Sequence, residues 1–209
     1  QARTQDLTDS NKKLNQVINE RKLLKSSLKH EVGTDFLTQL PSGVTFENDL
    51  QYLLERRDVN MQDGALLFLD LFKFEAINQR FGWDAGDYVL TNISKLLQSQ
   101  LGDGAMIGRL GGDQFAVYLK HAATTTANTT ARGLVDCISS FPIIWKEQTI
   151  QVEVCIGFCI VDSGELSARK ITSKAIHASV IAKENGVGSI VNYQDQTVKK
   201  LAEEADQDL

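Results

Sequence analysis

Two aspartates in this chain stand where carboxylates could do chemistry, Asp70 and Asp113. Asp70 lies near the end of the apolar run at residues 65–71, which is typical of a buried central strand. A charge there is costly unless a metal ion or a hydrogen bond to a helix N-terminus compensates it, and Asp70 alone does not decide between the two. Asp113 follows two glycines between the apolar stretches 105–110 and 115–119. Glycine pairs suit the positive φ angles of a tight hairpin turn.

If this hairpin flanks the strand at 65–71, its tip lies beside Asp70. Two carboxylates at neighbouring strand ends form a hard-oxygen site that suits Mg²⁺ together with substrate phosphates. The chemistry that such a site supports is phosphoryl or nucleotidyl transfer. The residue after Asp113 is Gln114, an amide at the place where a second carboxylate would help to hold the metal.

The elements that must position these residues are expected to alternate between helices and strands. Helical spacing and apolar runs predict helices at 44–57, 74–81, 85–101, 122–140 and 171–184, and strands at 65–71, 105–110, 115–119, 142–145, 150–161 and 189–193. The stretches 142–145 and 150–161 are interpreted as a second hairpin. Together these elements predict an α/β or α+β domain with a mixed sheet, at residues 34–194.

The two ends of the chain differ from this domain in composition. Residues 1–33 are rich in Gln, Asn, Lys and Glu, and their heptad seam is Leu7, Ser10, Leu14, Val17, Arg21, Leu24 and Leu28. This pattern predicts a coiled-coil linker helix that joins two copies of the chain into a homodimer. The alternative is a solvated helix that packs on its own domain. Residues 195–209 form an acidic tail, or a linker to a further domain.

Composition excludes several classes of partner. With 209 residues and a formal net charge of −5, the chain is not suited to binding a nucleic-acid polymer. Its three cysteines lack metal-ligand spacing, and we expect them to be reduced thiols in a cytoplasmic protein. No apolar run has the length of a membrane span, so we expect no membrane contact within this chain. Cytoplasmic location is compatible with a membrane anchor upstream.

Five sequence blocks, in the same order and spacing, resemble the GGDEF domain family of diguanylate cyclases. They are D-F-L-T-Q-L-P at 35–41, D-L-F-K-F-E-A-I-N with G-W-D-A-G-D at 70–87, R-L-G-G-D-Q-F at 109–115, V-C-I-G at 154–157 and A-K-E-N-G at 182–186. The resemblance covers residues 34 to 193. It identifies the chain as a degenerate member, with Gln where the signature has Glu.

The resemblance implies a palm-like fold, with a central, mostly antiparallel sheet of five or six strands flanked by helices. In this family two GTP-loaded protomers face each other and form cyclic di-GMP with the help of Mg²⁺. By motif, Asp70 and the Leu71 carbonyl would bind metal. Asp113 would bind metal or help to deprotonate the attacking hydroxyl, and Gln114 occupies the degenerate catalytic position beside it.

The same resemblance implies a nucleotide site. Asn78 and Asp87 would hydrogen-bond the guanine edge, which an amide and a carboxylate can both do. The alternative interpretation for these two residues is helix capping. Arg109 and Lys183 would lie near phosphate.

Departures from the family pattern gather at the catalytic end. They are Gln114 for glutamate, Glu75 for lysine, Phe72 and Gln79 for aspartate, Trp83 for histidine, Val187 for arginine and Ile176 for aspartate. The product-inhibition motif R-x-x-D would fall at residues 102–105 and is absent. Together these changes remove positive charge around the triphosphate and negative charge around the metal.

Three hypotheses follow from the sequence. The leading one is a catalytically inactive or weak domain that binds GTP as a regulatory ligand and dimerises. It would lie between an upstream sensor and a downstream output domain such as an EAL phosphodiesterase. The second is an active diguanylate cyclase, since Asp70 and Asp113 remain and water can complete a Mg²⁺ shell. The third is a purely structural dimerisation module.

Overall fold

The computed structural model describes residues 33–56, 64–161 and 167–195. The expected linker helix and the acidic tail lie outside the described residues, apart from Gly33 and Asp195. No helix in the described part of the chain is both long and apolar enough to cross a membrane.

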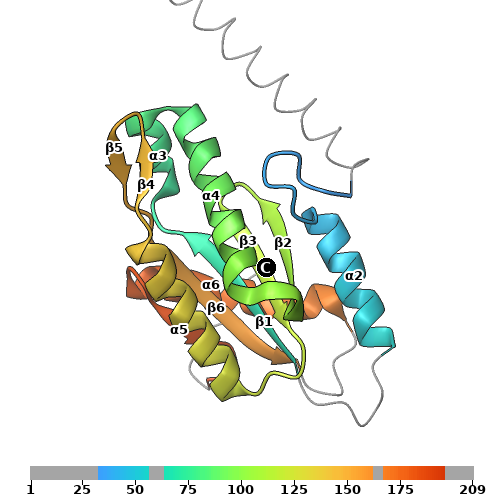
Figure 1. Ribbon diagram of the computed structural model, residues 1–209. Helices are drawn as coiled ribbons and strands as arrows, with labels where there is room; N and C mark the ends of the chain where they lie inside the picture. Colours follow the sequence, from blue (N-terminus) through green and yellow to red (C-terminus); the bar gives the residue numbers. More distant parts are fainter. Residues whose placement is uncertain (1–32, 57–63, 162–166, 196–209) are drawn as a thin grey trace, which may run out of the picture.

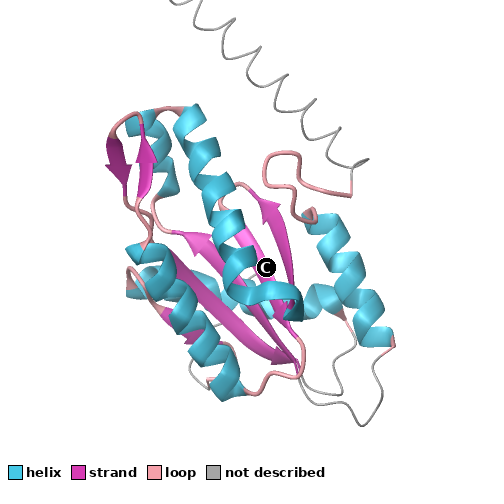
Figure 2. Cartoon of the chain, viewed as in Figure 1, coloured by secondary structure: helices cyan, strands magenta, loops and turns pink. Residues whose placement is uncertain are grey.

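A five-stranded mixed sheet forms the centre of the domain (Figures 1 and 2). Its strands, in spatial order, are β2 (Ala105–Gly111), β3 (Gln114–Leu119), β1 (Gly64–Leu71), β6 (Val154–Val161) and β7 (Ile190–Asn192). β7 runs parallel to β6, and the other neighbouring pairs are antiparallel. This arrangement confirms the fold class expected from the sequence.

In the described residues the α-helices are α2 (Gly43–Glu55), α3 (Phe74–Phe81), α4 (Trp83–Leu101), α5 (Thr124–Ser140) and α6 (Ala168–Asn185). Helix α3 packs mainly on α4, and the others flank the sheet. A 3₁₀ turn, η1 (Gly102–Gly104), joins α4 to β2. Helices α4 and α5 cover one face of the sheet, and α2 and α6 cover the other (Figure 1). The sheet is therefore the middle layer of three.

Strand β1 is the centre of the core because every one of its residues is buried. Leu67 and Leu69 pack with α4 and α5, whereas Leu66 and Phe68 pack with α2 and α6. An apolar run without alternation is what a strand covered on both faces requires. The predicted buried central strand is confirmed, and its last two residues reach the edge of the sheet where the charged groups gather.

Gly157 allows α6 to lie directly on the sheet. A Cβ at this position would overlap the α6 backbone near Ser179, so only glycine permits the close approach. The alanines of α6 face the same strands, and Ala175, Ala178 and Ala182 are fully buried. This packing fixes α6 against β6 and β1 and brings its last turn to the end of β1 that carries Asp70.

The second predicted hairpin is wrong in its extent. The structure has a small separate hairpin of β4 (Ile143–Trp145) and β5 (Gln148–Ile150), and β6 begins later and joins the main sheet. The turn is made by Lys146 and Glu147, both at positive φ (45° and 66°). Two-residue hairpin turns favour Asn and Gly, so neither residue type signalled the turn.

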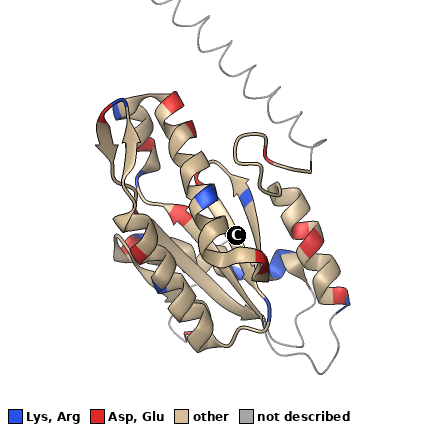
Figure 3. Ribbon diagram, in the orientation of Figure 1, with Lys and Arg blue, Asp and Glu red and all other residues tan. Residues whose placement is uncertain are grey.

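Charged residues of both signs are interspersed over the helices (Figure 3). This is the pattern of a solvated surface. The chemically informative charges are instead the few that lie at one end of the sheet.

Candidate functional site

The tip of the β2–β3 hairpin lies beside the end of β1. Asp70 pairs with Gln114 in the antiparallel register, and the Leu71 N–H donates to the Asp113 carbonyl oxygen at 3.3 Å. The two residues of the turn are Gly112 and Asp113, and Gly111 is the last residue of β2. Both glycines have the positive φ that the glycine pair predicted, 146° for Gly111 and 52° for Gly112. The structure therefore brings together Asp70, Leu71, Asp113 and Gln114 from two segments about 40 residues apart.

Both carboxylate oxygens of Asp70 contact other side chains of the chain. The Lys183 ammonium lies 2.7 Å from Oδ1, and the Gln114 amide donates to Oδ2 at 3.4 Å. The Asp70 side chain is only 7% exposed, whereas Lys183 is 42% exposed in the last turn of α6. Asp70 is thus a buried carboxylate whose charge is neutralised by a cation that reaches it from solvent.

The charges at this end of the sheet affect one another. Partial burial alone would lower the pKa of Lys183, but its contact with Asp70 and the attraction of both aspartates raise it. Burial and the nearby negative charge of Asp70 raise the pKa of Asp113. Lys183 therefore stays protonated at neutral pH, and the ionised form of Asp113 is disfavoured by its surroundings.

Cys155 stands opposite Asp70 in the β1–β6 register. Its Sγ donates to the Gly186 carbonyl oxygen at 3.4 Å, and burial raises the pKa of the thiol. A protonated thiol is a weak nucleophile. Cys155 and Cys159 are free and buried.

The donor set at this site does not fit a divalent cation as it stands. Asp70 is already paired with an ammonium, and an amide replaces the carboxylate that would stand next to Asp113. Within the described ranges, no cluster of three or more His, Cys, Asp or Glu side chains could hold a metal ion. Mg²⁺ prefers several oxygen ligands, and a neighbouring cation opposes it. The assignment of Asp70, Leu71 and Asp113 as metal ligands stays a prediction.

Arg109 lies inside the domain rather than at an open phosphate site. Its guanidinium forms an ion pair with Asp35 at 2.8 Å and donates twice to the Gly112 carbonyl oxygen, at 3.1 and 2.6 Å. Asp35 also accepts hydrogen bonds from the Thr38 N–H and hydroxyl. Arg109 thus ties the hairpin tip to the segment before α2. Its predicted phosphate contact stays a prediction.

Asp35 supports the site from inside the domain, and the sequence reasoning missed this role. It begins the first matched block, D-F-L-T-Q-L-P, which was the only signal for it. Burial alone would raise its pKa, but hydrogen bonds from Arg109 and Thr38 and the Arg109 charge outweigh burial and hold the pKa of Asp35 below its usual value.

The two predicted guanine-reading residues come from consecutive helices. Asn78 is in α3 and Asp87 is in α4, and Gly82 turns the chain between them at φ 89°. Asn78 Oδ1 is buried without a hydrogen-bond partner and lies in the space that a Cβ on Gly86 would occupy. A buried amide oxygen is costly when unpaired, so the Asn78 side chain lacks a partner that would stabilise it. Asp87 is exposed.

Helix capping does not explain these two residues. Helix α4 begins after Gly82 without a side-chain cap. At the end of α3, the Gly82 N–H donates to the backbone carbonyl of Asn78 and not to the Asn78 side chain. Their assignment to guanine stays a prediction.

The residues that depart from the family pattern differ in their surroundings. Glu75 accepts a hydrogen bond from Gln79 at 3.2 Å, so two departures on α3 bond to each other. Phe72 packs against a buried apolar cluster that includes Cys155 and Ala182. Val187 is 49% exposed and offers no charge to an anion.

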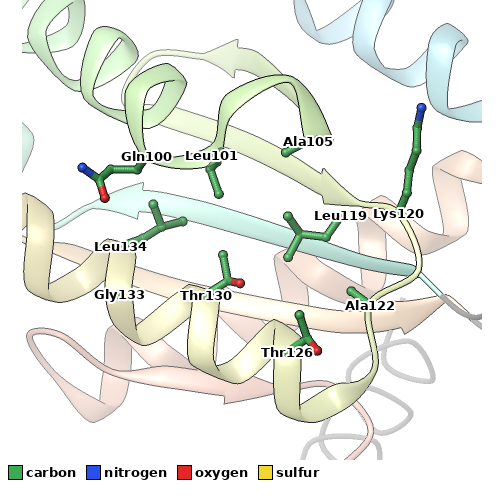
Figure 4. Close-up of a pocket in the computed structure, with 11 residues that line it drawn as sticks. Gln100, Leu101, Ala105, Leu119, Lys120, Ala122, Thr126, Thr130, Gly133 and Leu134 are labelled. Atoms are coloured by element: carbon green, nitrogen blue, oxygen red, sulfur yellow. The ribbon is translucent and has the colours of Figure 1, made fainter.

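A cavity of about 420 Å³ lies at the other end of β3 from Asp113 (Figure 4). Leu101, Leu119, Leu134 and Thr130 are among its lining residues, which come from α4, β3 and α5. None of the site residues named above lines it.

Comparisons with known proteins agree with the resemblance. The family described as "Diguanylate cyclase, GGDEF domain" matches residues 32–189. The chain is 29% identical over 201 residues to "Probable diguanylate cyclase DgcE" of Escherichia coli, covering 96% of this chain and 17% of that protein. It is 32% identical over 165 residues to "Diguanylate cyclase TpbB" of Pseudomonas aeruginosa, covering 78% of this chain and 38% of that protein.

A solved structure gives the same answer for the fold. The GGDEF domain of TpbB from Pseudomonas aeruginosa superposes with a TM-score of 0.75 at 30% identity, covering 81% of this chain and 99% of that one. The chain thus spans well under half the length of both curated relatives, but nearly all of the solved domain.

Proposed function

The chain belongs to the GGDEF domain family of diguanylate cyclases, and we propose that this domain binds GTP as a regulatory ligand with weak or no cyclase activity of its own. It would act in cyclic di-GMP signalling as a dimerising module that controls a neighbouring output domain. The observation that carries this proposal is the contrast between the two ends of the site. The guanine end keeps both of its polar groups, Asn78 and Asp87. The metal end keeps Asp70 and Asp113, but it has an amide at Gln114 and an ammonium on Asp70.

The guanine end is supported by Asn78 and Asp87. Asn78 presents a buried amide oxygen that lacks a partner within the described structure, and Asp87 offers an exposed carboxylate on the next helix. Guanine carries N–H donors on its Watson–Crick edge, which both groups can accept. Adenine has an acceptor on this edge where guanine has an N–H donor, and it would leave the Asn78 oxygen unpaired. The site should therefore prefer GTP to ATP.

The metal end is weakened by Gln114. Loss of one unit charge about 4 Å from a metal costs roughly 4 kcal/mol per cation charge at an effective dielectric of about 20, before solvent relaxes. Even half of that corresponds to one to two decades in rate or metal affinity. The Glu75 carboxylate and the uncharged Val187 add to the loss because both stand where the family pattern has a cation.

An output domain and a dimer partner belong to the same proposal. The curated relatives are much longer than this chain, which leaves room in those proteins for neighbouring domains. We propose that residues 1–33 link the domain to an upstream sensor and to a second copy of the chain, and that an EAL-type phosphodiesterase or similar output domain follows.

A second candidate function is diguanylate cyclase activity itself. It is favoured by the names of the relatives, a diguanylate cyclase for TpbB and a probable one for DgcE, and by the survival of Asp70 and Asp113 beside each other. The two candidates differ in turnover, not in fold.

Calorimetric titration tests the binding proposal. GTP should release or absorb measurable heat with the wild-type chain, and ATP should bind at least about tenfold more weakly, because one well-placed hydrogen bond distinguishes the bases. Asp87→Ala should weaken GTP binding, whereas Asp136→Ala, an exposed aspartate on α5, should not. Equal binding in both variants would contradict the assignment of Asp87.

A further inference from the structure

The contacts of Asp70 show where a cation already sits. Lys183 Nζ lies 2.7 Å from one carboxylate oxygen, and the Gln114 amide donates to the other at 3.4 Å. A divalent ion that used Asp70 as a ligand would have to displace one or both of these groups. The carboxylate is buried, so its charged form is costly unless a cation or a hydrogen-bond donor balances it.

The local charge also disfavours a second cation. Asp70 and Asp113 together with Lys183 leave a single net negative charge, and Gln114 adds none. A divalent ion brought in beside the ammonium would leave the cluster net positive, and the two cations would repel each other. A carboxylate at 114 would have supplied the missing charge and could not have donated to Asp70.

The elements that hold Lys183 in place are closely packed. Its helix is pressed onto the sheet at Gly157, and Ala182, the residue before it, is fully buried. Phe72 packs into the same apolar cluster as Ala182. The backbone of Lys183 is therefore fixed at the end of β1, while its side chain remains partly exposed and can contact a ligand as well as Asp70.

We propose that Lys183 is the built-in counterion of Asp70, in the place of a divalent cation, and that a guanine nucleotide binds this domain without a divalent metal. The nucleotide part of this inference rests on the function proposed above, but the counterion part does not. In the complex the ammonium is shared between the Asp70 carboxylate and a phosphate oxygen. Lys183 thus supplies to the phosphate the positive charge that a metal would bring.

Manganese titration of the full 209-residue chain tests the counterion part without any nucleotide. Free Mn²⁺ is followed by electron paramagnetic resonance, and the wild type should bind it no more than about twofold tighter than Asp70→Asn. Lys183→Met should bind Mn²⁺ at least about tenfold tighter than the wild type, because the competing cation is gone. Lys170→Met, on the exposed face of the same helix, is the matched control and should match the wild type.

Thermal unfolding gives a second measurement for variants that are less stable. Lys183→Met should unfold at a lower temperature in EDTA, because Asp70 is left unbalanced, and Mn²⁺ should restore much of the loss. The wild type should show no shift with Mn²⁺. Wild-type binding of Mn²⁺ ten times tighter than in Asp70→Asn, or a Lys183→Met variant that matches the wild type in both measurements, would overturn the proposal.

Titration of GTP in EDTA and in Mg²⁺ tests the nucleotide part. The wild-type affinity should change by less than about threefold between the two conditions, and Lys183→Met should lose binding in EDTA. A tenfold or greater dependence on Mg²⁺ would overturn metal-free binding. If GTP binds in neither condition, the function proposed above and the nucleotide part both fail, while the manganese data still decide the role of Lys183.

Discussion

The side chains of Arg109 and Asp35, 74 residues apart in the sequence, meet as a buried ion pair at 2.8 Å. They are 8% and 4% exposed. Arg109 also holds the Gly112 carbonyl oxygen, so the pair fixes the hairpin tip that carries Asp113. The position of the candidate site therefore depends on a contact outside it.

Replacing Asp35 by Asn should destabilise the domain strongly. Removal of one partner of a buried pair leaves the other charge uncompensated, at a cost of about 3–5 kcal/mol. Asp49→Asn, on α2 and away from this pair, should cost less than about 0.5 kcal/mol. Urea unfolding of both variants at pH 7 checks the difference, and similar midpoints would contradict the role of the pair.

The same residue should give the domain an acid-sensitive stability. The pKa of Asp35 is held below its ordinary value of 3.8 in the folded state, so its contribution is present above that pH. It is lost as pH falls through the folded value, because the unfolded chain then binds more protons. Unfolding free energy measured from pH 6 down to pH 2.5 should therefore fall less steeply in Asp35→Asn. Parallel curves for the two proteins would show that Asp35 does not titrate this way.

The ionised Asp113 should lower the stability of the folded domain at neutral pH, whereas the ionised Asp35 raises it. Burial and Asp70 raise the pKa of Asp113, so its ionised form is a cost to the folded state at neutral pH. Asp113→Asn should raise the melting temperature slightly at pH 7, by up to about 2 °C after allowance for solvent screening. The gain should vanish below pH 3.8, where the aspartate is protonated in both states. A loss of stability at pH 7 would mean that the Asp113 charge has a favourable partner.

Gly86 should be essential for the position of Asn78. A Cβ on Gly86 would overlap the Asn78 side chain, so Gly86→Ala should cost about 1–3 kcal/mol and weaken GTP binding at least about tenfold. Gly133→Ala is the matched helical control, since a Cβ there meets nothing within 4 Å, and it should gain about 0.5–1 kcal/mol. Calorimetry and thermal unfolding of the two variants check both signs. An unchanged GTP affinity in Gly86→Ala would show that Asn78 does not take part in GTP binding.

Much of the framework could be predicted from local patterns. The buried strand β1 and the turn before Asp113 are each determined by a few neighbouring residues, an apolar run and a glycine pair. Both predictions are therefore confirmed. The meeting of Asp70 and Asp113 followed from one assumption about which strands are neighbours, and the register confirms it.

The rest could not be predicted because it depends on tertiary contacts or unusual turn residues. The turn at Lys146 and Glu147 uses residue types that do not mark a turn. The sequence placed Arg109 and Lys183 near phosphate, yet their contacts with Asp35 and Asp70 join segments 74 and 113 residues apart. Such pairs appear only when helix and sheet packing is known.

The central claim is that the metal end of the site no longer supports the cyclase reaction, and it is tested most directly by assaying cyclic di-GMP. The wild-type chain, Asp113→Ala and the double variant Gln114→Glu with Glu75→Lys are each incubated with GTP and Mg²⁺ or Mn²⁺. We expect wild-type product at the level of Asp113→Ala, and at least tenfold more from the double variant, since one to two decades were assigned to the lost charge. Clear wild-type turnover that Asp113→Ala abolishes would contradict this account and establish an active diguanylate cyclase.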